Sequence, residues 1–337
     1  MARKRLIVPI FIPHQGCPYR CVFCNQTDIT GQDKQADHDM VLEPLREYLG
    51  SRPLDQMPEF REAAFYGGTF TGLPSRRQEF LLSLLQPWLD DGMIHAIRVS
   101  THSLYIDAGR LALLKKYRVK TVELGVQSTD PEVLNLSGRE TAPGLVAEAA
   151  ALIRKNNFNL GLQLMPGLPG DTVEKFMRSV DEVLSMKPDF VRLYPTLVIR
   201  NTRLHEMYRR GEYRPWDMET TIDALKLAAL KFAEAGVPVI RIGLHPEPSL
   251  LKGYVAGPFH PSMRYLVDCR IGLDRMVKIL KGQNTLPDQV AFRVPSNEFS
   301  IYTGHKKENL GKLKKLFGLD KVSLLRGKKE DELELVA

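Results

Sequence analysis

The sequence lacks any apolar run of about 18 residues, the length that a membrane-spanning helix needs. No membrane association is therefore expected. Its basic start, "MARKRLIVPIFIPH", is similar to an export signal, but two prolines interrupt the apolar part and no small-residue cleavage site follows. We interpret this stretch as a first strand and predict a cytoplasmic protein. Internal repeats and low-complexity segments are also missing, which excludes a repeat architecture.

Cysteine is scarce, with four residues in 337, yet three of them lie in "CPYRCVFC" as Cys17, Cys21 and Cys24. In a reducing compartment such cysteines favour metal or redox roles over disulfides. Thiolates select zinc or iron–sulfur clusters. A zinc site needs a fourth ligand, for which His14 and the distant Cys269 are available. A [4Fe–4S] cluster held by three cysteines would instead keep one iron open for a ligand. Unliganded thiols are the third alternative.

Composition sets only broad limits. A hydrophobic fraction of 43% and a charged fraction of 26% are ordinary for a globular protein. The net charge of +7 is compatible with a polyanionic partner but does not establish one. The length suffices for one large α/β domain with a smaller lobe.

Short β-rich runs alternate with amphipathic helical stretches along most of the chain. The expected strands are residues 5–12, 62–68, 95–101, 121–127, 159–165 and 189–195, and the expected helices between them include 76–89, 108–117, 144–156 and 172–185. Strands that alternate with helices form parallel sheets, because parallel neighbours need crossover connections. The units are fewer than a full (β/α)8 barrel has. We therefore predict an α/β fold, a partial (β/α)6 TIM-like open barrel.

The predicted barrel spans residues 1–245, closed by a helix at 219–235 and a strand at 237–244. Residues 246–337 are expected to form a C-terminal extension with a small basic α/β lobe. Within that lobe, residues 299–327 predict a strand, a basic helix and a strand.

Polar or Gly/Pro-rich loops follow each predicted strand in turn. They read "CPYRCVFC", "GGTFTGLP", "THS", "QS", "PGLPG" and "PT". Parallel α/β folds place their chemistry at the carboxyl ends of the strands. The loops therefore predict a single site at one end of the barrel.

The cysteine spacing, with Phe23 just before the last cysteine, resembles the signature of radical S-adenosylmethionine enzymes. The predicted partial barrel is also similar to the fold of that superfamily. The resemblance implies a [4Fe–4S] cluster on Cys17, Cys21 and Cys24, with S-adenosyl-L-methionine on the open iron. Reduction then cleaves that cofactor to methionine and a 5′-deoxyadenosyl radical. A low-potential electron donor, flavodoxin or ferredoxin, is implied as a partner.

Three further segments extend the resemblance. "FYGGTFTGLP" looks like the motif that lines the methionine amino group, where glycines let the backbone approach a ligand closely. "ELGVQSTDPEVLNLSGRET" and "LQLMPGLPG" resemble segments of oxygen-independent coproporphyrinogen oxidase and the catalytic subunit of Elongator, and "VRLYPTLVIRNTRLHEMYRRGEY" is nearly identical to an Elongator segment. The cofactor contacts implied are Phe23, Gly67, Gly68, Thr69, Gln127, Arg139 (at the methionine carboxylate) and Gln163 (at the ribose).

The chain also departs from those relatives. Where they have Glu after the third strand, this chain has Ser100 in "VSTHS", so Ser100 or His102 is expected to replace the missing carboxylate. Elongator's cysteine loop is longer, and its acetyltransferase domain finds no room within residues 246–337. The few cysteines exclude methylthiolating enzymes, which need a second cluster, and two-cysteine methyl carriers.

Two more residues are candidates for catalysis. Tyr194 ends the sixth strand and points either into the mouth of the barrel or into the core. Cys269 lies in a predicted helix, where it either packs among apolar neighbours or donates hydrogen to the substrate.

Two basic segments stand out, residues 199–214 and residues 301–329, the second with nine Lys or Arg and two acidic residues. Each is either a solvated helix face or a phosphate-contacting surface. The leading prediction is a radical S-adenosylmethionine enzyme of the Elongator-like branch that modifies RNA, tRNA foremost. The alternatives are a radical enzyme for a small anionic metabolite or porphyrin, and a noncatalytic iron–sulfur sensor or accessory protein.

Overall fold

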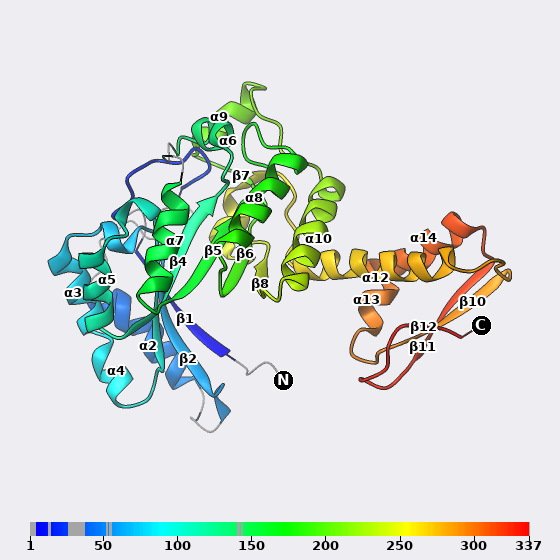
Figure 1. Ribbon diagram of the computed structural model, residues 1–337, viewed down its shortest axis with the longest axis horizontal. Helices are drawn as coiled ribbons and strands as arrows, with labels where there is room; N and C mark the ends of the chain where they lie inside the picture. Colours follow the sequence, from blue (N-terminus) through cyan, green and yellow to red (C-terminus); the bar gives the residue numbers. More distant parts are fainter. Residues whose placement is uncertain are drawn as a thin grey trace.

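The computed structural model describes residues 5–12, 15–25, 38–51, 53, 56–139, 142 and 144–336 (Figure 1). Its main sheet has seven strands that are all parallel, in the order in which the chain makes them. They are β1 (Arg5–Phe11), β2 (Phe60–Tyr66), β3 (Ala96–Thr101), β4 (Val119–Gln127), β5 (Asn159–Leu164), β6 (Phe190–Leu193) and β8 (Val239–Ile242). The curled, open sheet confirms the predicted partial barrel and its additional closing strand.

Helices cover the outer face of this sheet. They are α2 (His38–Gly50), α3 (Ser75–Ser83), α4 (Gln86–Asp90), α5 (Ala108–Lys116), α7 (Leu145–Lys155), α8 (Val173–Ser185) and α10 (Met218–Glu234), while α6 (Pro131–Leu136) and α9 (Arg203–Arg209) lie at the carboxyl end of the strands (Figure 1). The single helix expected at 76–89 is in fact two helices. Pro87 lies in the first turn of α4, where its missing N–H costs least.

The two faces of the sheet differ because successive strand residues point to opposite sides. On β4, Val122, Leu124 and Val126 are buried and belong to the main apolar core under the helices. Thr121 and Glu123 alternate with them and are buried as well, on the inner face. The barrel interior is therefore polar, while its outer layer supplies the apolar core.

The C-terminal lobe is built on one long helix, α12 (Met263–Lys281). It leads to the strands β10 (Gln289–Val294), β11 (Lys321–Arg326) and β12 (Glu334–Leu335) and the helices α13 (Phe299–Thr303) and α14 (Glu308–Phe317). The first half of α12 buries Met263 and Val267 in the main core, and the second half buries Leu273 and Met276 in the lobe's own core. The division at residue 245 stays a prediction, since α12 packs into both cores.

The strand expected at the start of residues 299–327 is wrong. Those residues form α13, which Gly304 ends with a φ of +78°. The central strand of the lobe is β10, which the sequence pattern did not predict, and it pairs with β11 and β12. In the described part of the chain, no helix combines the length and the apolar character needed to cross a bilayer.

Gly161 on β5 has no room for a side chain, and this predicts a stability effect. A Cβ at this position would lie 2.3 Å from the ring of Phe190. Gly161→Ala should therefore lower the free energy of unfolding by about 1–3 kcal/mol, the usual cost of overpacking. Urea unfolding followed by circular dichroism measures the change.

Gly311→Ala is the matched control, because Gly311 lies within α14 with nothing within 4 Å of a new Cβ. It should stabilise the protein slightly, by about 0.5–1 kcal/mol. Equal stabilities of Gly161→Ala and the unsubstituted protein would contradict the packing argument.

Candidate active site

The cysteine loop, residues 15–25, lies at the carboxyl end of β1 and is held by backbone contacts from three directions. Thr69 N–H donates to the Gln15 carbonyl oxygen at 2.8 Å. The Val22 N–H donates to the Ser137 carbonyl at 3.0 Å, and the Leu204 N–H of α9 donates to the Val22 carbonyl at 2.8 Å. Loops that follow β2, β4 and β6 thus position the cysteines.

The cysteine thiols touch two of the residues predicted to contact the cofactor. Thr69 Oγ1 donates to Cys17 Sγ at 3.5 Å, and Arg139 Nη1 donates to Cys21 Sγ at 3.7 Å. Cys24 continues the turn, its N–H donating to the Cys21 carbonyl at 3.0 Å. These residues are far apart in sequence, and the fold brings Thr69 and Arg139 to the cysteine loop.

The Cys17 thiol titrates unusually. Although the residue reaches the surface, desolvation of the sulfur raises its pKa, while the hydrogen bond from Thr69 opposes that rise. The neighbouring Cys21 raises the pKa further, and the positive charge of Arg139 lowers it. A thiol of raised pKa keeps its proton near neutral pH unless a metal ion displaces it.

Gly67 and Gly68 follow β2, as predicted, but Gly68 serves a purpose that the motif did not reveal. A Cβ on Gly68 would lie 2.5 Å from the Ile12 carbonyl oxygen and 2.6 Å from that of Gln15. Its missing side chain therefore lets the glycine loop pack against the backbone that leads into the cysteine loop. Gly67 has a φ of +84°, which a residue with a side chain rarely adopts.

Gly16 and Gly72 form a second close contact between the same two loops, and the sequence argument missed both. A Cβ on Gly16 would lie 2.2 Å from the Thr69 carbonyl oxygen, and one on Gly72 would lie 2.2 Å from that of Gly16. The signal was available, because a glycine immediately before the first cysteine indicates close backbone approach.

The ends of β4 and β5 bring three more predicted residues together. Gln163 Nε2 donates to Gln127 Oε1 at 3.0 Å, and an Arg139 guanidinium N–H donates to the Gly125 carbonyl. The pairing of β4 with β5 shifts register between Gly125 and Gln127, and Gln127 has a φ of +69°. This bulge turns the Gln127 side chain at the strand's end, where its amide also lies against Gly125.

At the end of β3, Ser100 lies opposite Glu123 in the sheet register, and its Oγ has no hydrogen-bond partner in the described part of the chain. His102 follows and is only 2% exposed. Its ring centroid lies 5.6 Å from that of Tyr19 in the cysteine loop. Burial, reinforced by the positive charge of Arg139, lowers the pKa of His102 to about 3, so the ring is neutral at neutral pH.

Beneath these loops the barrel interior holds a buried network of charges that the sequence analysis missed. Arg98 pairs with Glu62 at 2.7 Å and with Glu123 at 3.1 Å. Arg192 pairs with the other oxygen of Glu123, also at 3.1 Å, and Thr121 Oγ1 donates to Glu62 at 3.1 Å. The charges balance, with two carboxylates facing two guanidinium groups. Charged residues within strands otherwise buried on both faces were the signal for it.

Tyr194 completes this network at the mouth of the barrel. Arg192 donates to the Tyr194 hydroxyl at 2.9 Å and to the Tyr66 hydroxyl at 2.6 Å. Burial, together with the Glu123 carboxylate, raises the pKa of Tyr66 to about 12, so its phenol stays protonated. Both phenol oxygens accept from Arg192, which leaves their O–H protons available as donors.

Phe23 and Cys269 have contacts of a different kind. Phe23 packs on a small apolar cluster with Val22, Val198 and Leu204 beside the cysteine loop. Cys269 is buried on α12, and its carbonyl accepts from Asn309 of the lobe at 2.9 Å. Cys269 therefore packs between α12 and the lobe, while its role in catalysis stays a prediction.

The basic segments differ in where they lie. Helix α9 adjoins the cysteine loop, and its segment exposes Arg200, Arg203, Arg209, Arg210 and Arg214. The lysines of residues 301–329 belong to the lobe on the far side of α12 (Figure 1). Only the first segment is attached to the mouth of the barrel.

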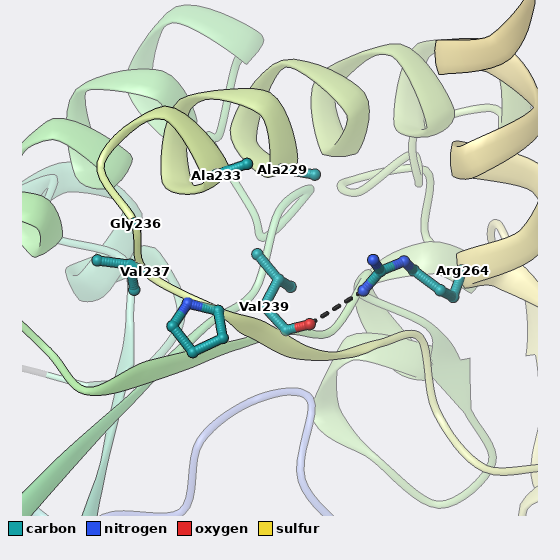
Figure 2. Close-up of a pocket in the computed structure, with 7 residues that line it drawn as sticks. Ala229, Ala233, Gly236, Val237, Val239 and Arg264 are labelled. Carbon is teal, nitrogen blue, oxygen red and sulfur yellow. Dashed lines mark hydrogen bonds between the residues drawn. The ribbon is translucent and has the colours of Figure 1, made fainter. Parts of the chain in front are cut away.

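A hollow of about 510 Å³ lies elsewhere, at the outer edge of β8 (Figure 2). It is lined by Ala229, Ala233, Gly236, Val237, Pro238, Val239 and Arg264. Arg264 closes one side by donating to the Val239 carbonyl at 3.0 Å. None of these residues belongs to the loops around the cysteines, so the hollow takes no part in the candidate site.

Comparisons with known proteins agree with this geometry. A family model described as "Radical SAM superfamily" matches residues 11–183, and one described as "Radical_SAM C-terminal domain" matches residues 188–272. A tRNA uridine(34) acetyltransferase of Methanocaldococcus infernus is 32% identical over 136 residues, 40% of this chain and 26% of that protein. The Homo sapiens Elongator complex protein 3 is 27% identical over 209 residues, 56% of this chain and 38% of that protein. The chain thus spans less than half the length of these relatives.

The solved structure of the archaeal Methanocaldococcus infernus Elp3 is similar in fold. It superposes with a TM-score of 0.61 and 21% sequence identity, covering 83% of this chain and 64% of that one. At this identity the likeness extends to the fold alone.

The buried charges predict a large stability effect. Arg98→Met removes the partner that Glu62 and Glu123 share, and an uncompensated buried carboxylate typically costs about 3–5 kcal/mol. The free energy of unfolding, measured in urea, should fall by that amount. Arg118→Met, which breaks an exposed pair with Asp90, is the control and should cost about 0–1 kcal/mol. Similar losses for both variants would show that the network contributes no more than a surface pair.

Proposed function

This chain belongs to the radical SAM superfamily and is an enzyme of that class, and we propose that Cys17, Cys21 and Cys24 hold its [4Fe–4S] cluster with one iron open for S-adenosylmethionine. The resemblance noted in the sequence is thereby confirmed at the level of the family. The observation that carries the proposal is the contact of Thr69 and Arg139 with the cysteine sulfurs.

The donor set suits a cluster better than a single ion. Among the described ranges, no three His, Cys, Asp or Glu side chains converge as the ligands of one metal ion do. An iron–sulfur cluster is held differently, with each thiolate on its own iron. His14, the fourth ligand that a zinc site would use, lies outside the described residues. Three thiols in one loop, none of them in a disulfide, support the cluster.

The surrounding side chains offer complementary chemistry to the cofactor. Held by Cys17, Cys21 and Cys24 and reduced by one electron, the cluster with bound S-adenosylmethionine would supply radical chemistry for hydrogen abstraction. The guanidinium of Arg139 suits the methionine carboxylate. The Gln163–Gln127 hydrogen bond leaves the Gln163 oxygen and the Gln127 N–H groups free to bind ribose hydroxyls. The backbone of Gly67 and Gly68 lies at the same carboxyl edge of the sheet. Tyr194 is the residue proposed to face the substrate.

The chemistry also implies a reductant and a compartment. A low-potential electron donor such as flavodoxin or ferredoxin is the proposed partner. None of the four cysteines forms a disulfide in the structure, which suits a reducing environment, and the cytoplasm is the proposed location.

RNA is the proposed substrate class, tRNA first. The named relatives include tRNA uridine(34) acetyltransferases, although they match only part of this chain. The exposed arginines beside α9 support the proposal, because α9 adjoins the cysteine loop and guanidinium groups suit phosphates. No acetyl transfer is proposed for this chain.

The cluster proposal predicts a clear difference between two cysteine variants. After anaerobic reconstitution with iron and sulfide, Cys21→Ala should lose the visible absorbance of the cluster and form no 5′-deoxyadenosine with dithionite and S-adenosylmethionine. Cys269→Ala, the control, should keep both, because Cys269 packs against the lobe. Mass spectrometry detects 5′-deoxyadenosine. A fully loaded native cluster that cleaves no cofactor, with or without tRNA, would favour the sensor or accessory alternative.

The RNA proposal predicts a specific salt dependence. The double variant Arg203→Glu with Arg209→Glu should bind bulk tRNA more weakly and lower the slope of log affinity against log salt by about 2, roughly one for each lost phosphate contact. Fluorescence anisotropy over a salt series measures the slope. Arg46→Glu with Lys115→Glu makes the same charge change on α2 and α5 and should leave the slope nearly unchanged. Equal losses in both variants would speak against a contact at α9 and leave the small-metabolite alternative ahead.

A further inference from the structure

Two buried polar atoms at the end of β3 have no partner in the described part of the chain. They are Ser100 Oγ and His102 Nε2. A buried donor without an acceptor costs about 1–3 kcal/mol, so native proteins seldom keep one without a reason. One atom belongs to β3 and the other to the residue directly after that strand, where the His102 ring packs on Tyr19 of the cysteine loop. Two such atoms so close in the chain indicate a bound group that satisfies them.

The hydrogen bonds of His102 define what this group must be. His102 Nδ1 accepts from the Leu104 N–H at 3.1 Å, so Nδ1 carries no proton and the neutral ring has its proton on Nε2. The free nitrogen is therefore a donor. Ser100 adds a hydroxyl that can donate as well. The end of β3 thus offers donors where a carboxylate would offer only acceptors.

The surroundings add one positive charge. Arg139 lies close enough to His102 for its charge to affect the ring, and it also contacts the Cys21 thiol. Tyr19 of the cysteine loop packs against one side of the His102 ring. The oxygens of Glu123, the nearest carboxylate in the register, are already engaged by Arg98 and Arg192. One cation and two neutral donors match a carboxylate, whose oxygens accept several hydrogen bonds.

We propose that Ser100 and His102 join Arg139 in binding the α-carboxylate of S-adenosylmethionine. The inference rests on the proposed function, because a cofactor held at the cysteine loop would bring its amino-acid carboxylate to this place. The glutamate of the relatives would accept hydrogen bonds, whereas Ser100 and His102 donate them. The end of β3 would therefore bind the carboxylate of the methionyl part.

The test compares two substitutions of His102, each of which preserves the hydrogen-bonding role of only one ring nitrogen. His102→Asn keeps an acceptor near Nδ1, which caps the turn at Leu104, and removes the distal donor. His102→Gln keeps a donor near Nε2 and sacrifices the cap. Binding of S-adenosylmethionine to the reconstituted protein is measured by anaerobic equilibrium dialysis. His102→Asn should weaken it about 10- to 100-fold, the effect of losing a hydrogen bond to a charged group, and His102→Gln should weaken it much less.

Decarboxylated S-adenosylmethionine, which keeps the amine and lacks the carboxylate, is the decisive probe. Ser100→Ala and His102→Asn should bind it about as well as the unsubstituted protein does. The electron paramagnetic resonance spectrum of the reduced cluster provides a second reading of ligand binding. Absorbance confirms that each variant carries its cluster, and Ser100→Ala tests the proposal independently if His102→Asn fails to fold.

The outcomes separate the two proposals. If the unsubstituted protein binds and cleaves S-adenosylmethionine while Ser100→Ala and His102→Asn bind it normally, the carboxylate site is overturned and the proposed function stands. Equal losses for both forms of the cofactor also overturn the site, because the side chains would then serve another group or the fold. If the loaded protein neither binds nor cleaves S-adenosylmethionine, the proposed function fails and the inference falls with it.

Discussion

The buried ion pairs of the barrel interior constrain the rest of the structure. Glu62, Arg98, Glu123 and Arg192 come from four different strands, and each charge is matched only when the strands keep their observed register. A slip of one residue would turn the charged side chain toward the apolar layer under the helices. Such networks add little stability over apolar packing, but breaking one leaves a charge uncompensated. The network thereby makes any other register costly.

The correct register in turn aligns the loops that make the site. Because all seven strands run parallel, their carboxyl ends meet at one edge, and the loops after β1, β2 and β4 contact one another through backbone groups. Gly16, Gly68 and Gly72 allow these contacts, since any side chain there would collide with a neighbouring backbone. The cysteine loop is therefore positioned by its neighbours. The loop itself contributes the thiols and the close backbone approach at Gly16.

The polar groups of the barrel interior lie at different depths. The paired charges lie lowest, the phenols of Tyr66 and Tyr194 lie above them on Arg192, and the donors of the loops lie at the mouth. Exposed arginines lie in and beside α9, which contacts the cysteine loop. The apolar hollow at the edge of β8 and the lobe beyond α12 stand outside the barrel interior.

The sequence by itself determined the cysteine motif, the alternation of strands and helices and the succession of polar loops, because these are local patterns of period and spacing. It therefore predicted the partial barrel and some of the residues that meet at its mouth, such as Thr69, Gln127, Arg139 and Gln163. It misjudged residues 299–303, whose short β-like composition is overridden by the packing of α13, and it overlooked β10. Only the tertiary structure decided which backbone Gly68 meets, which charges pair across the barrel and which atoms of Ser100 and His102 find no partner among the described residues. Those features join residues far apart in the chain, and no local pattern encodes such contacts.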